Sequence, residues 1–265
     1  MKIAILGTGN LGQAIANGLI QSGSYTQLVL TRRDLKSLAS YKDYRGLVLS
    51  SSNTEAVQQS DIILLCVQPP QLSAILAEIR PLLTDKHVLI STVTGYTIAQ
   101  MEAILGQEHF LIRAMPNTAI SVGQSMTCLC SNTAGEKRIE IAEAIFQKLG
   151  HSLKIHEEHM QAATVICASG IAFWMRLIRA TTQGAIQLGF DAKEAQLLAM
   201  HTCQGAAALL IEGGAHPEEE IDRVTTPQGC TIQGLNEMEH QGLSSSLIQG
   251  IIASFSKISE IKSPE

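Results

Sequence analysis

The sequence predicts an α/β protein with a doubly wound parallel sheet over residues 1–156 and an all-helical domain over residues 157–265. Two observations predict this division. In the first part, short continuous apolar runs alternate with helical patterns, whereas the second part is rich in alanine, leucine and glutamine and holds few β-rich runs. Continuous apolar runs are typical of strands covered by helices on both faces, and strands separated by helices favour a parallel sheet.

The predicted strands of the first domain are short and regularly spaced. They lie at residues 2–6, 27–30, 46–49, 61–67, 87–91, 110–113, 125–130 and 152–155. An amphipathic helical stretch over residues 13–20 follows the first strand, and a charged helix over about 134–149 precedes the last one. This order predicts one sheet with helices packed on it.

The second domain is predicted to consist of helices alone. Residues 159–188 contain no proline and predict one long helix. Asp191 and Glu194 form a capping box for a second helix, which two glycines end after Glu212. Three shorter helices are predicted to start at Pro217, Thr231 and Ser244. Because these helices carry more apolar surface than they can cover, we expect the domain to dimerise.

Composition and charge are typical of a soluble globular protein. Hydrophobic residues make up 45% of the 265 residues, charged residues make up 16%, and the net charge is −5. No basic cluster exceeds the pair Arg32–Arg33, so we expect no nucleic-acid partner. No uninterrupted apolar run approaches the roughly 18 residues that span a bilayer, so we expect no membrane segment. The first apolar run lacks a basic leader and is interpreted as a strand rather than a signal peptide.

Cysteine usage indicates a reducing compartment, and the cytoplasm is the expected location. The chain has 6 cysteines, with neither a C-x-x-C pair nor a histidine at ligand spacing. We interpret them as buried apolar thiols and expect no metal site. They are Cys66, Cys128, Cys130, Cys167, Cys203 and Cys230.

The most informative motif is the glycine loop after the first predicted strand. Residues 2–12 read KIAILGTGNLG, which is an apolar strand followed by G-x-G-x-x-G and then a helical pattern. Gly7 permits the tight turn, Gly9 lets the backbone approach a pyrophosphate, and Gly12 lets the helix pack closely on the strand. Unpaired N–H groups at the helix start favour phosphate there. The motif predicts a Rossmann-like dinucleotide site, and a plain turn at the end of a sheet strand is the alternative.

The end of the second predicted strand favours NADP over NAD. A site for NAD normally has Asp or Glu there to accept the ribose 2′-hydroxyl, but this chain has Thr31, Arg32 and Arg33. Two guanidinium groups can bind a 2′-phosphate through charge-assisted hydrogen bonds. A solvated helix start is the alternative interpretation, and Asp34 leaves a route to NAD. The expected cofactor is therefore NADP(H), with NAD(H) less favoured.

Further motifs accompany the glycine loop and together resemble one family. RAMPNT at residues 113–118 and CVQP at 66–69 each follow a predicted strand, where open α/β sheets bind their ligands. Residues 224–235, in the helical domain, read VTTPQGCTIQGL. The sequence resembles the pyrroline-5-carboxylate reductase family, which carries R-x-M-P-N-T, V-K-P after the fourth strand, and S-P-G-G-T-T-I in its helical domain. The resemblance covers nearly the whole chain.

The resemblance implies a cofactor site at the carboxyl ends of the strands. Leu6 to Leu11 would hold the pyrophosphate, Arg32 and Arg33 would lie near the adenosine ribose, and Asn53 would lie near the adenine. The residues implied to contact the cofactor are Leu6, Gly7, Thr8, Gly9, Asn10, Leu11, Arg32, Arg33, Asn53, Val67, Gln68, Pro69, Thr92, Val93 and Thr94.

The resemblance also implies a substrate site. Met115 and Asn117 would frame the nicotinamide end of the cleft and bind substrate. Gly229, Cys230 and Thr231 would hold the substrate carboxylate through backbone N–H groups, and Thr231 would face the ring nitrogen as the catalytic residue. The local pattern agrees, because a helix N-terminus is a ready carboxylate site and a hydroxyl can exchange hydrogen bonds with an imine nitrogen.

Two stretches depart from the family pattern. Residues 167–173 read CASGIAF where the family has S-G-S-G-P-A-Y, so a helix-breaking proline and a tyrosine hydroxyl are missing. The family's P-G-G has become Pro227, Gln228 and Gly229. Both departures fall in the substrate half, so they bear on substrate identity and rate rather than on cofactor binding.

The resemblance implies NADPH-dependent reduction of 1-pyrroline-5-carboxylate to proline, the last step of proline biosynthesis. The hydride would go to the C=N carbon, in a cleft between the two domains of a homodimer or of a larger assembly of dimers. Two alternatives stay open. One is a reductase of another cyclic imine on the same fold, and the other is a catalytically weak relative that binds the dinucleotide and acts as a regulatory protein.

Overall fold

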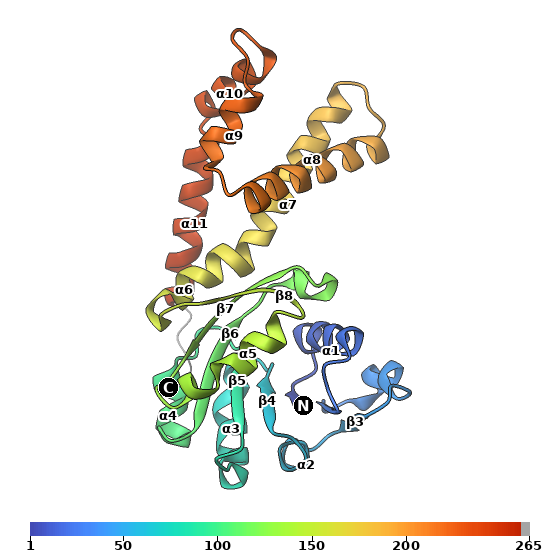
Figure 1. Ribbon diagram of the computed structural model, residues 1–265, viewed down its shortest axis with the longest axis vertical. Coiled ribbons are helices and arrows are strands. Elements are labelled where there is room, and N and C mark those ends of the chain that lie inside the picture. The colour runs from blue at the N-terminus through green and yellow to red at the C-terminus, as the bar shows by residue number, and fades with distance from the viewer. Residues whose placement is uncertain (261–265) are drawn as a thin grey trace. The chain divides into compact units, whose positions relative to one another are not determined.

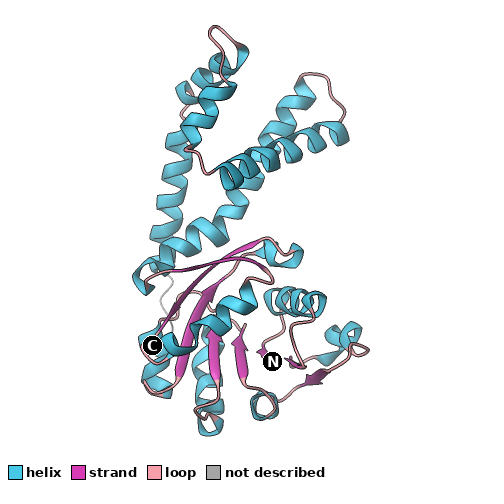
Figure 2. Ribbon diagram, in the orientation of Figure 1, coloured by secondary structure: helices cyan, strands magenta, loops and turns pink. Residues whose placement is uncertain are grey.

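A computed structural model describes residues 1–260 of the chain. The chain forms two compact units. The first consists of residues 1–169 with the end of the last helix from Phe255, and the second of Gly170–Ser254. All described strands belong to the first unit, and the second contains helices and loops (Figures 1 and 2). The α/β fold with a helical C-terminal part is confirmed, whereas the division at residues 156 and 157 stays a prediction.

One eight-stranded sheet forms the centre of the first unit. Its strand order is β3-β2-β1-β4-β5-β6-β7-β8, and all neighbouring strands are parallel except β6 and β7. The strands are β1 (Lys2–Leu6), β2 (Gln27–Thr31), β3 (Leu47–Ser50), β4 (Ile62–Leu65), β5 (Val88–Ser91), β6 (Phe110–Met115), β7 (Ser125–Ser131) and β8 (Gly150–Lys154).

Strand β7 runs antiparallel to β6, whereas the sequence predicts a parallel sheet and gives no direction for this strand. The connection between these strands is residues 116–124 and contains only the short 3-10 turn η3 (Thr118–Val122). A parallel crossover needs about a dozen residues or more, usually with a helix. The connection is therefore too short to return β7 in the parallel direction.

Helices cover both faces of the sheet, which explains the continuous apolar runs. Ile5 and Leu6 are neighbours in β1, but they belong to two different hydrophobic clusters, one on each face, and both are fully buried. Figure 1 shows the helices of these two layers. The first cluster includes α1 (Asn10–Ser22) and α5 (Ile139–Phe146), and the second includes α2 (Asn53–Gln58), α3 (Pro69–Ile79) and α4 (Ile98–Leu105).

An ion pair between buried Arg113 and half-buried Glu157 fixes the chain where it leaves the sheet. Arg113 of β6 donates from Nη1 to Oε1 of Glu157 at 2.9 Å, and the Arg113 side chain is 8% exposed. The same Glu157 oxygen accepts the backbone N–H of Ile98, the first residue of α4, at 2.7 Å. One carboxylate thus joins β6, α4 and the start of the segment that follows.

The predicted long helix is helical throughout but changes its type. It consists of the 3-10 turn η5 (Glu157–His159), α6 (Met160–Ala163), a π-helical turn (Thr164–Ser169) and α7 (Gly170–Gln187). The π-helical turn includes Cys167, in the stretch that departs from the family pattern. The irregularity therefore exists here without a proline.

The remaining helices of the second unit start close to the predicted positions. They are α8 (Ala192–Gly213), α9 (Pro217–Val224), α10 (Cys230–His240) and α11 (Leu243–Glu260). The N-cap role of Asp191 is confirmed, because its carboxylate accepts the N–H groups of Lys193 and Glu194 at 2.7 and 3.1 Å. The return bond from the Glu194 side chain that a capping box needs is not present within residues 1–260. Helices α7 and α8 pack against each other.

The second unit buries very little of itself. Gly170, Thr182, Ala195 and Ala199 are its only buried residues. Large apolar side chains stay exposed instead, including Trp174 at 58%. The predicted excess of apolar helix surface is therefore confirmed.

One helical stretch is long and apolar enough to cross a membrane, judged by length and composition only. It is Glu157–Gln187, with a mean hydropathy of 1.4 over its most apolar window, and 17% of that window is buried. The average is high although charged residues interrupt the apolar runs. The expectation that the chain has no membrane segment therefore stays a prediction.

Candidate functional site

A cavity of about 760 Å³ lies at the carboxyl ends of strands in the first unit. The sheet order places β1 between β2 and β4. The chain thus adds β2 and β3 on one side of β1 and then crosses over to add β4 on the other side. Open α/β sheets bind ligands at such a reversal. The lining residues are Gly7, Thr8, Gly9, Thr31, Arg32, Arg33, Asp34, Ser51, Asn53, Cys66, Val67, Gln68, Pro70, Gln71, Ala74 and Ile75.

The three glycines of the loop meet different requirements. Gly7 has φ +87°, and a Cβ there would lie 2.9 Å from the Cys66 carbonyl oxygen. A Cβ on Gly12 would lie 2.8 Å from the Gly7 carbonyl oxygen, so the helix packs as closely as the sequence predicts. A Cβ on Gly9 would meet nothing within 4 Å. The fold itself thus needs Gly7 and Gly12, whereas the space beside Gly9 suits a bound group such as a pyrophosphate.

Thr31 holds the glycine loop in place, a role that the sequence did not reveal. Its hydroxyl accepts the N–H of Gly7 at 3.3 Å and donates to Oδ1 of Asn53 at 2.8 Å. Its carbonyl accepts the N–H of Thr8 at 2.8 Å. The only available signal was a polar residue at the end of an apolar strand. Ser51, Pro70, Gln71, Ala74 and Ile75 also line the cavity and were not predicted.

The two arginines at this cavity differ in their contacts. Arg32 is half-buried and donates from Nη1 to the Thr8 carbonyl at 3.0 Å. Arg33 is exposed and makes no recorded hydrogen bond or ion pair within residues 1–260. Asp34 accepts the N–H of Lys36 and begins the 3-10 turn η1 (Leu35–Tyr41). Two guanidinium groups beside a carboxylate that caps a turn fit a 2′-phosphate better than a 2′-hydroxyl.

Several residues expected to contact the cofactor do not line this cavity. Leu6 is fully buried in the core, and Pro69 is the first residue of α3. Thr92 donates its hydroxyl to the Leu65 carbonyl at 3.0 Å, which joins β4 to β5. The expected cofactor residues outside the lining are Leu6, Asn10, Leu11, Pro69, Thr92, Val93 and Thr94, and the lining also lacks Met115 and Asn117, which were expected to bind substrate.

Cys66 lines the cavity as a neutral thiol. Burial raises the pKa of Cys66 to about 12. At neutral pH it is therefore protonated and not a nucleophile. The Cys66 side chain therefore forms part of the cavity wall but contributes no negative charge to it.

Asn117 joins the loop after β6 to the π-helical turn. Its Oδ1 accepts the N–H of Ala119 at 2.9 Å, and its Nδ2 donates to the Cys167 carbonyl at 3.0 Å. Its own N–H donates to the Ser125 hydroxyl at 3.1 Å. Met115, two residues earlier, is 4% exposed and receives a contact from the Thr94 hydroxyl at 3.9 Å. Both predicted residues thus lie where β6 ends. The Asn117 side-chain amide already has hydrogen-bond partners within the protein.

The loop from Gln228 to Thr231 belongs to the second unit and begins α10. Gln228 has φ +59° and is the only described non-glycine residue with a positive φ, and Gly229 is the N-cap residue without a side-chain cap bond. A Cβ on Gly229 would lie 3.0 Å from the Thr226 carbonyl oxygen. Thr231 is half-buried, and no hydrogen bond of its hydroxyl is recorded within the described chain. The first N–H groups of α10 and this hydroxyl are thus available to a ligand.

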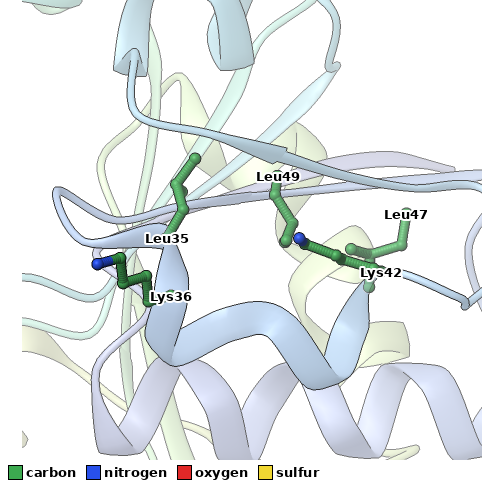
Figure 3. Close-up of a pocket in the computed structure, with 5 residues that line it drawn as sticks. All are labelled: Leu35, Lys36, Lys42, Leu47 and Leu49. Atoms are coloured by element: carbon green, nitrogen blue, oxygen red, sulfur yellow. The ribbon is translucent and has the colours of Figure 1, made fainter.

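A smaller cavity of about 420 Å³ lies beside β3 (Figure 3). Three leucines and two lysines line it, namely Leu35, Lys36, Lys42, Leu47 and Leu49. It contains none of the predicted site residues. Among residues 1–260, no group of three or more His, Cys, Asp or Glu side chains is placed to hold a metal ion.

The fold and the glycine-loop cavity define the class of protein as a Rossmann-like oxidoreductase with a helical second part. Two family models support and refine this class. The model described as "NADP oxidoreductase coenzyme F420-dependent" matches residues 2–95, and the model described as "Pyrroline-5-carboxylate reductase dimerisation" matches residues 157–261. The helical part is therefore a dimerisation domain.

Curated relatives specify the family. "Pyrroline-5-carboxylate reductase 1" of Dictyostelium discoideum is 44% identical over 98% of this chain, and the match spans 49% of that protein. "Pyrroline-5-carboxylate reductase 2" of the same organism is 42% identical, covering 98% of this chain and 92% of that protein. This chain thus spans about half the length of the first relative and nearly all of the second.

Solved structures agree with these relatives. A pyrroline-5-carboxylate reductase from Coxiella burnetii is 28% identical, with a TM-score of 0.92 over 99% of each chain. The enzyme from Plasmodium falciparum, solved with NADP bound, is 25% identical, with a TM-score of 0.83 over 97% of each chain. The chain belongs to the pyrroline-5-carboxylate reductase family.

Proposed function

We propose that this chain reduces 1-pyrroline-5-carboxylate to proline with NADPH. The observation that carries the proposal is the cavity that joins the glycine loop to Arg32 and Arg33, in a chain 42% identical to a named pyrroline-5-carboxylate reductase of similar length. When bound, NADPH supplies the hydride that goes to the C=N carbon of the imine. The protein supplies positioning and electrostatics.

The residues of the first unit bind and orient the cofactor. N–H groups at the start of α1 hold the pyrophosphate beside Gly9, where the fold leaves space. Arg32 and Arg33 bind the 2′-phosphate, and Asn53, held by Thr31, lies at the adenine end. The rest of the dinucleotide contacts two further segments, residues 67–69 and 92–94.

The arginine pair sets the preference for NADP(H). Replacing both residues, as Arg32→Ala/Arg33→Ala, removes the two charges that bind the 2′-phosphate, and the ratio of NADPH to NADH affinities falls toward one. Fluorescence titration of both cofactors measures the ratio. An unchanged ratio refutes this assignment, and NAD(H) then becomes the better candidate.

The residues of the second unit bind the substrate. The N–H groups of Gly229, Cys230 and Thr231 at the start of α10 hold the substrate carboxylate, and the Thr231 hydroxyl lies beside the ring nitrogen. Met115 and Asn117, in the first unit, frame the nicotinamide end of the site. No further acid is required, because the iminium forms in water before it binds.

Turnover of the imine tests the activity directly. Adding 1-pyrroline-5-carboxylate to the chain with NADPH lowers the ultraviolet absorbance of NADPH and produces proline. Turnover of a different cyclic imine, but not of this one, supports the first alternative. Cofactor binding without turnover of any imine in a panel supports the regulatory alternative and refutes the proposal.

Thr231 separates catalysis from cofactor binding. A hydrogen bond to a charged group is worth about 1.5–3 kcal/mol, so Thr231→Ala lowers kcat by about tenfold to a hundredfold. The Kd of NADPH stays unchanged, and Thr231→Ser, which keeps the hydroxyl, retains most of the rate. Equal losses of turnover and NADPH affinity contradict this division of roles.

The chain works as a homodimer, or as a larger assembly of such dimers, in the cytoplasm. A partner copy covers the apolar faces of the dimerisation domain. These faces include part of Glu157–Gln187, the stretch that is long and apolar enough to cross a membrane. Sedimentation equilibrium then gives a multiple of two chains, and the chain does not partition into lipid vesicles. Stable insertion into vesicles contradicts this proposal.

A further inference from the structure

We propose that Cys128 and Cys167 are an oxidisable thiol pair, which a hydroperoxide converts to a disulfide. We further propose that this bond lowers the reductase activity, a consequence that rests on the proposed function. The pair is formed by residues from different elements, β7 and the π-helical turn, within the first unit. Neither residue belongs to the predicted site.

The two sulfur atoms are in contact. Their Sγ atoms lie 3.8 Å apart. A disulfide has a sulfur–sulfur length of about 2.05 Å, so bond formation needs an approach of about 2 Å. Cys128 lies on a rigid strand and is 3% exposed, whereas Cys167 is half-buried on the irregular helical turn. Most of the movement therefore falls on the helical side.

The pair has one more accessible and more acidic member. The hydrogen bond from Cys128 lowers the pKa of Cys167, while the same contact and burial raise the pKa of Cys128. Burial also raises the pKa of Cys66 to about 12 and that of Cys130 to about 11. Because the thiolate is the nucleophile, Cys167 reacts first among the cysteines of this unit.

The chemistry balances with one hydroperoxide molecule. The Cys167 thiolate attacks one oxygen of hydrogen peroxide, so an S–O bond forms, the O–O bond breaks, and hydroxide leaves. The Cys128 sulfur then attacks the Cys167 sulfur, so the S–S bond forms and the S–O bond breaks. The hydroxide from the first step takes the proton that the Cys167 thiol released on ionising, and the hydroxide from the second step takes the Cys128 proton. In total, two thiols are oxidised, and the peroxide is reduced to two molecules of water.

Both cysteines contact the residues that frame the proposed nicotinamide end. Cys128 lies opposite Met115 in the β6–β7 ladder. The Cys167 carbonyl accepts the Asn117 amide at 3.0 Å. Drawing Cys167 toward β7 therefore moves a carbonyl on which Asn117 depends.

The expected effect on the rate follows from this geometry. Displacing a positioning group by about 1 Å can cost on the order of a hundredfold in rate. Because the two sulfurs must approach by about twice that distance, mostly through movement of the helical side, we expect oxidation to lower kcat at least tenfold. The π-helical turn is suited to such a change, since π-helical segments are local irregularities often found at functional sites.

The test uses the full chain treated with hydrogen peroxide and then with an alkylating reagent. Peptide mass mapping is expected to find the Cys128–Cys167 cross-link, with a loss of two hydrogens, and dithiothreitol is expected to restore both the thiols and the rate. The rate of Cys167→Ser, compared with that of the same variant before treatment, is insensitive to peroxide. Cys130→Ala, a buried cysteine on the same strand, keeps the wild-type sensitivity as the matched control.

The outcomes separate the two parts of the proposal from the proposed function. A cross-link to another cysteine, or no cross-link while the rate falls, overturns the thiol pair. A quantitative cross-link with an unchanged rate overturns its effect on activity. If the untreated chain has no reductase activity, the proposed function is refuted. The thiol pair is then still tested separately, because mass mapping of the peroxide-treated wild type decides whether the disulfide forms.

Discussion

The two units of this protein differ in how much of their apolar surface they bury and in how many of their polar side chains they hydrogen-bond by themselves. In residues 1–169, most apolar side chains of the central strands β1, β2, β4 and β5 are fully buried, and polar ones such as Thr31, Asn117 and Glu157 are hydrogen-bonded within the unit. In Gly170–Ser254, only four residues are buried, and the Thr231 hydroxyl has no hydrogen-bond partner among residues 1–260. The first unit buries its apolar side chains within a single chain, whereas the dimerisation domain leaves apolar side chains for a partner copy to cover.

The difference has a simple energetic origin. Burying a large apolar side chain is worth about 1.5–3 kcal/mol. A sheet with helices on both faces gains this from its own chain, whereas Trp174, Leu209 and Ile211 remain 58%, 56% and 75% exposed. A second copy that covers such residues supplies the missing burial, in agreement with the dimerisation family match.

The largest expected effect tests the incomplete unit. Leu209→Asp places a charge on an apolar face that we expect a partner copy to cover, and burying an unpaired charge costs several kcal/mol. We expect the dimer Kd to rise by roughly a hundredfold or more, which corresponds to about 3 kcal/mol. Sedimentation velocity measures the change.

The matched control is Leu153→Asp, because Leu153 on β8 is 52% exposed and Leu209 is 56% exposed. This variant keeps the wild-type Kd if the difference between the units holds. Equal weakening by the two variants would break the comparison, because an exposed leucine in either unit would then serve the interface.

The next effect tests the complete unit at its ion pair. Glu157→Ala leaves the guanidinium of buried Arg113 without its partner and removes the acceptor of the Ile98 N–H. Breaking a fully buried pair costs about 3–5 kcal/mol, and since the Glu157 side chain is 33% exposed we expect roughly 2–3 kcal/mol in the free energy of unfolding.

Denaturant unfolding followed by circular dichroism gives this value. Glu158→Ala, at an exposed neighbouring glutamate with no recorded ion pair, is expected to change stability by less than about 0.5 kcal/mol. The ion pair has no structural importance if both variants unfold alike.

Asn117 gives a smaller effect of the same kind. Asn117→Ala leaves the Ala119 N–H and the Cys167 carbonyl without their partners, and such groups cost about 1–3 kcal/mol when buried. We expect a loss near 2 kcal/mol. Asn236→Ala, on the exposed side of α10, is the control and leaves stability nearly unchanged. Thermal unfolding of both variants decides whether Asn117 holds the π-helical turn.

The smallest effect concerns Gln228 in the left-handed region. The left-handed conformation costs about 1–2 kcal/mol for a residue with a Cβ, and glycine gives back about 0.5–1 kcal/mol through its greater unfolded-state entropy. Gln228→Gly is therefore expected to stabilise the chain by less than about 1 kcal/mol, while Gln228→Ala gives no gain. A higher Tm for the alanine variant than for the glycine variant would show that the backbone is not strained here.

The sequence predicted the positions of the strands and turns better than it predicted strand direction and long-range hydrogen bonds. The alternation of apolar runs and helical patterns located every strand of the sheet, and the glycine spacing located the turn that lines the large cavity. Those signals are local, because they depend on propensity and on residues within one strand–turn–helix. The direction of β7 was missed because it depends on how far the connection can reach. Thr31 was missed because its hydrogen bonds join residues more than 20 positions apart.

The sequence by itself determined the fold class, the phosphate-binding turn, the arginine pair and the family, because each is written in contiguous residues with a fixed local geometry. Only the tertiary structure decided which of the site residues already have partners and which remain available. It also brought Cys128 and Cys167, 39 positions apart, into contact. The physical reason is that hydrogen bonds and sulfur contacts act over a few ångströms in space, and the folded chain sets those distances.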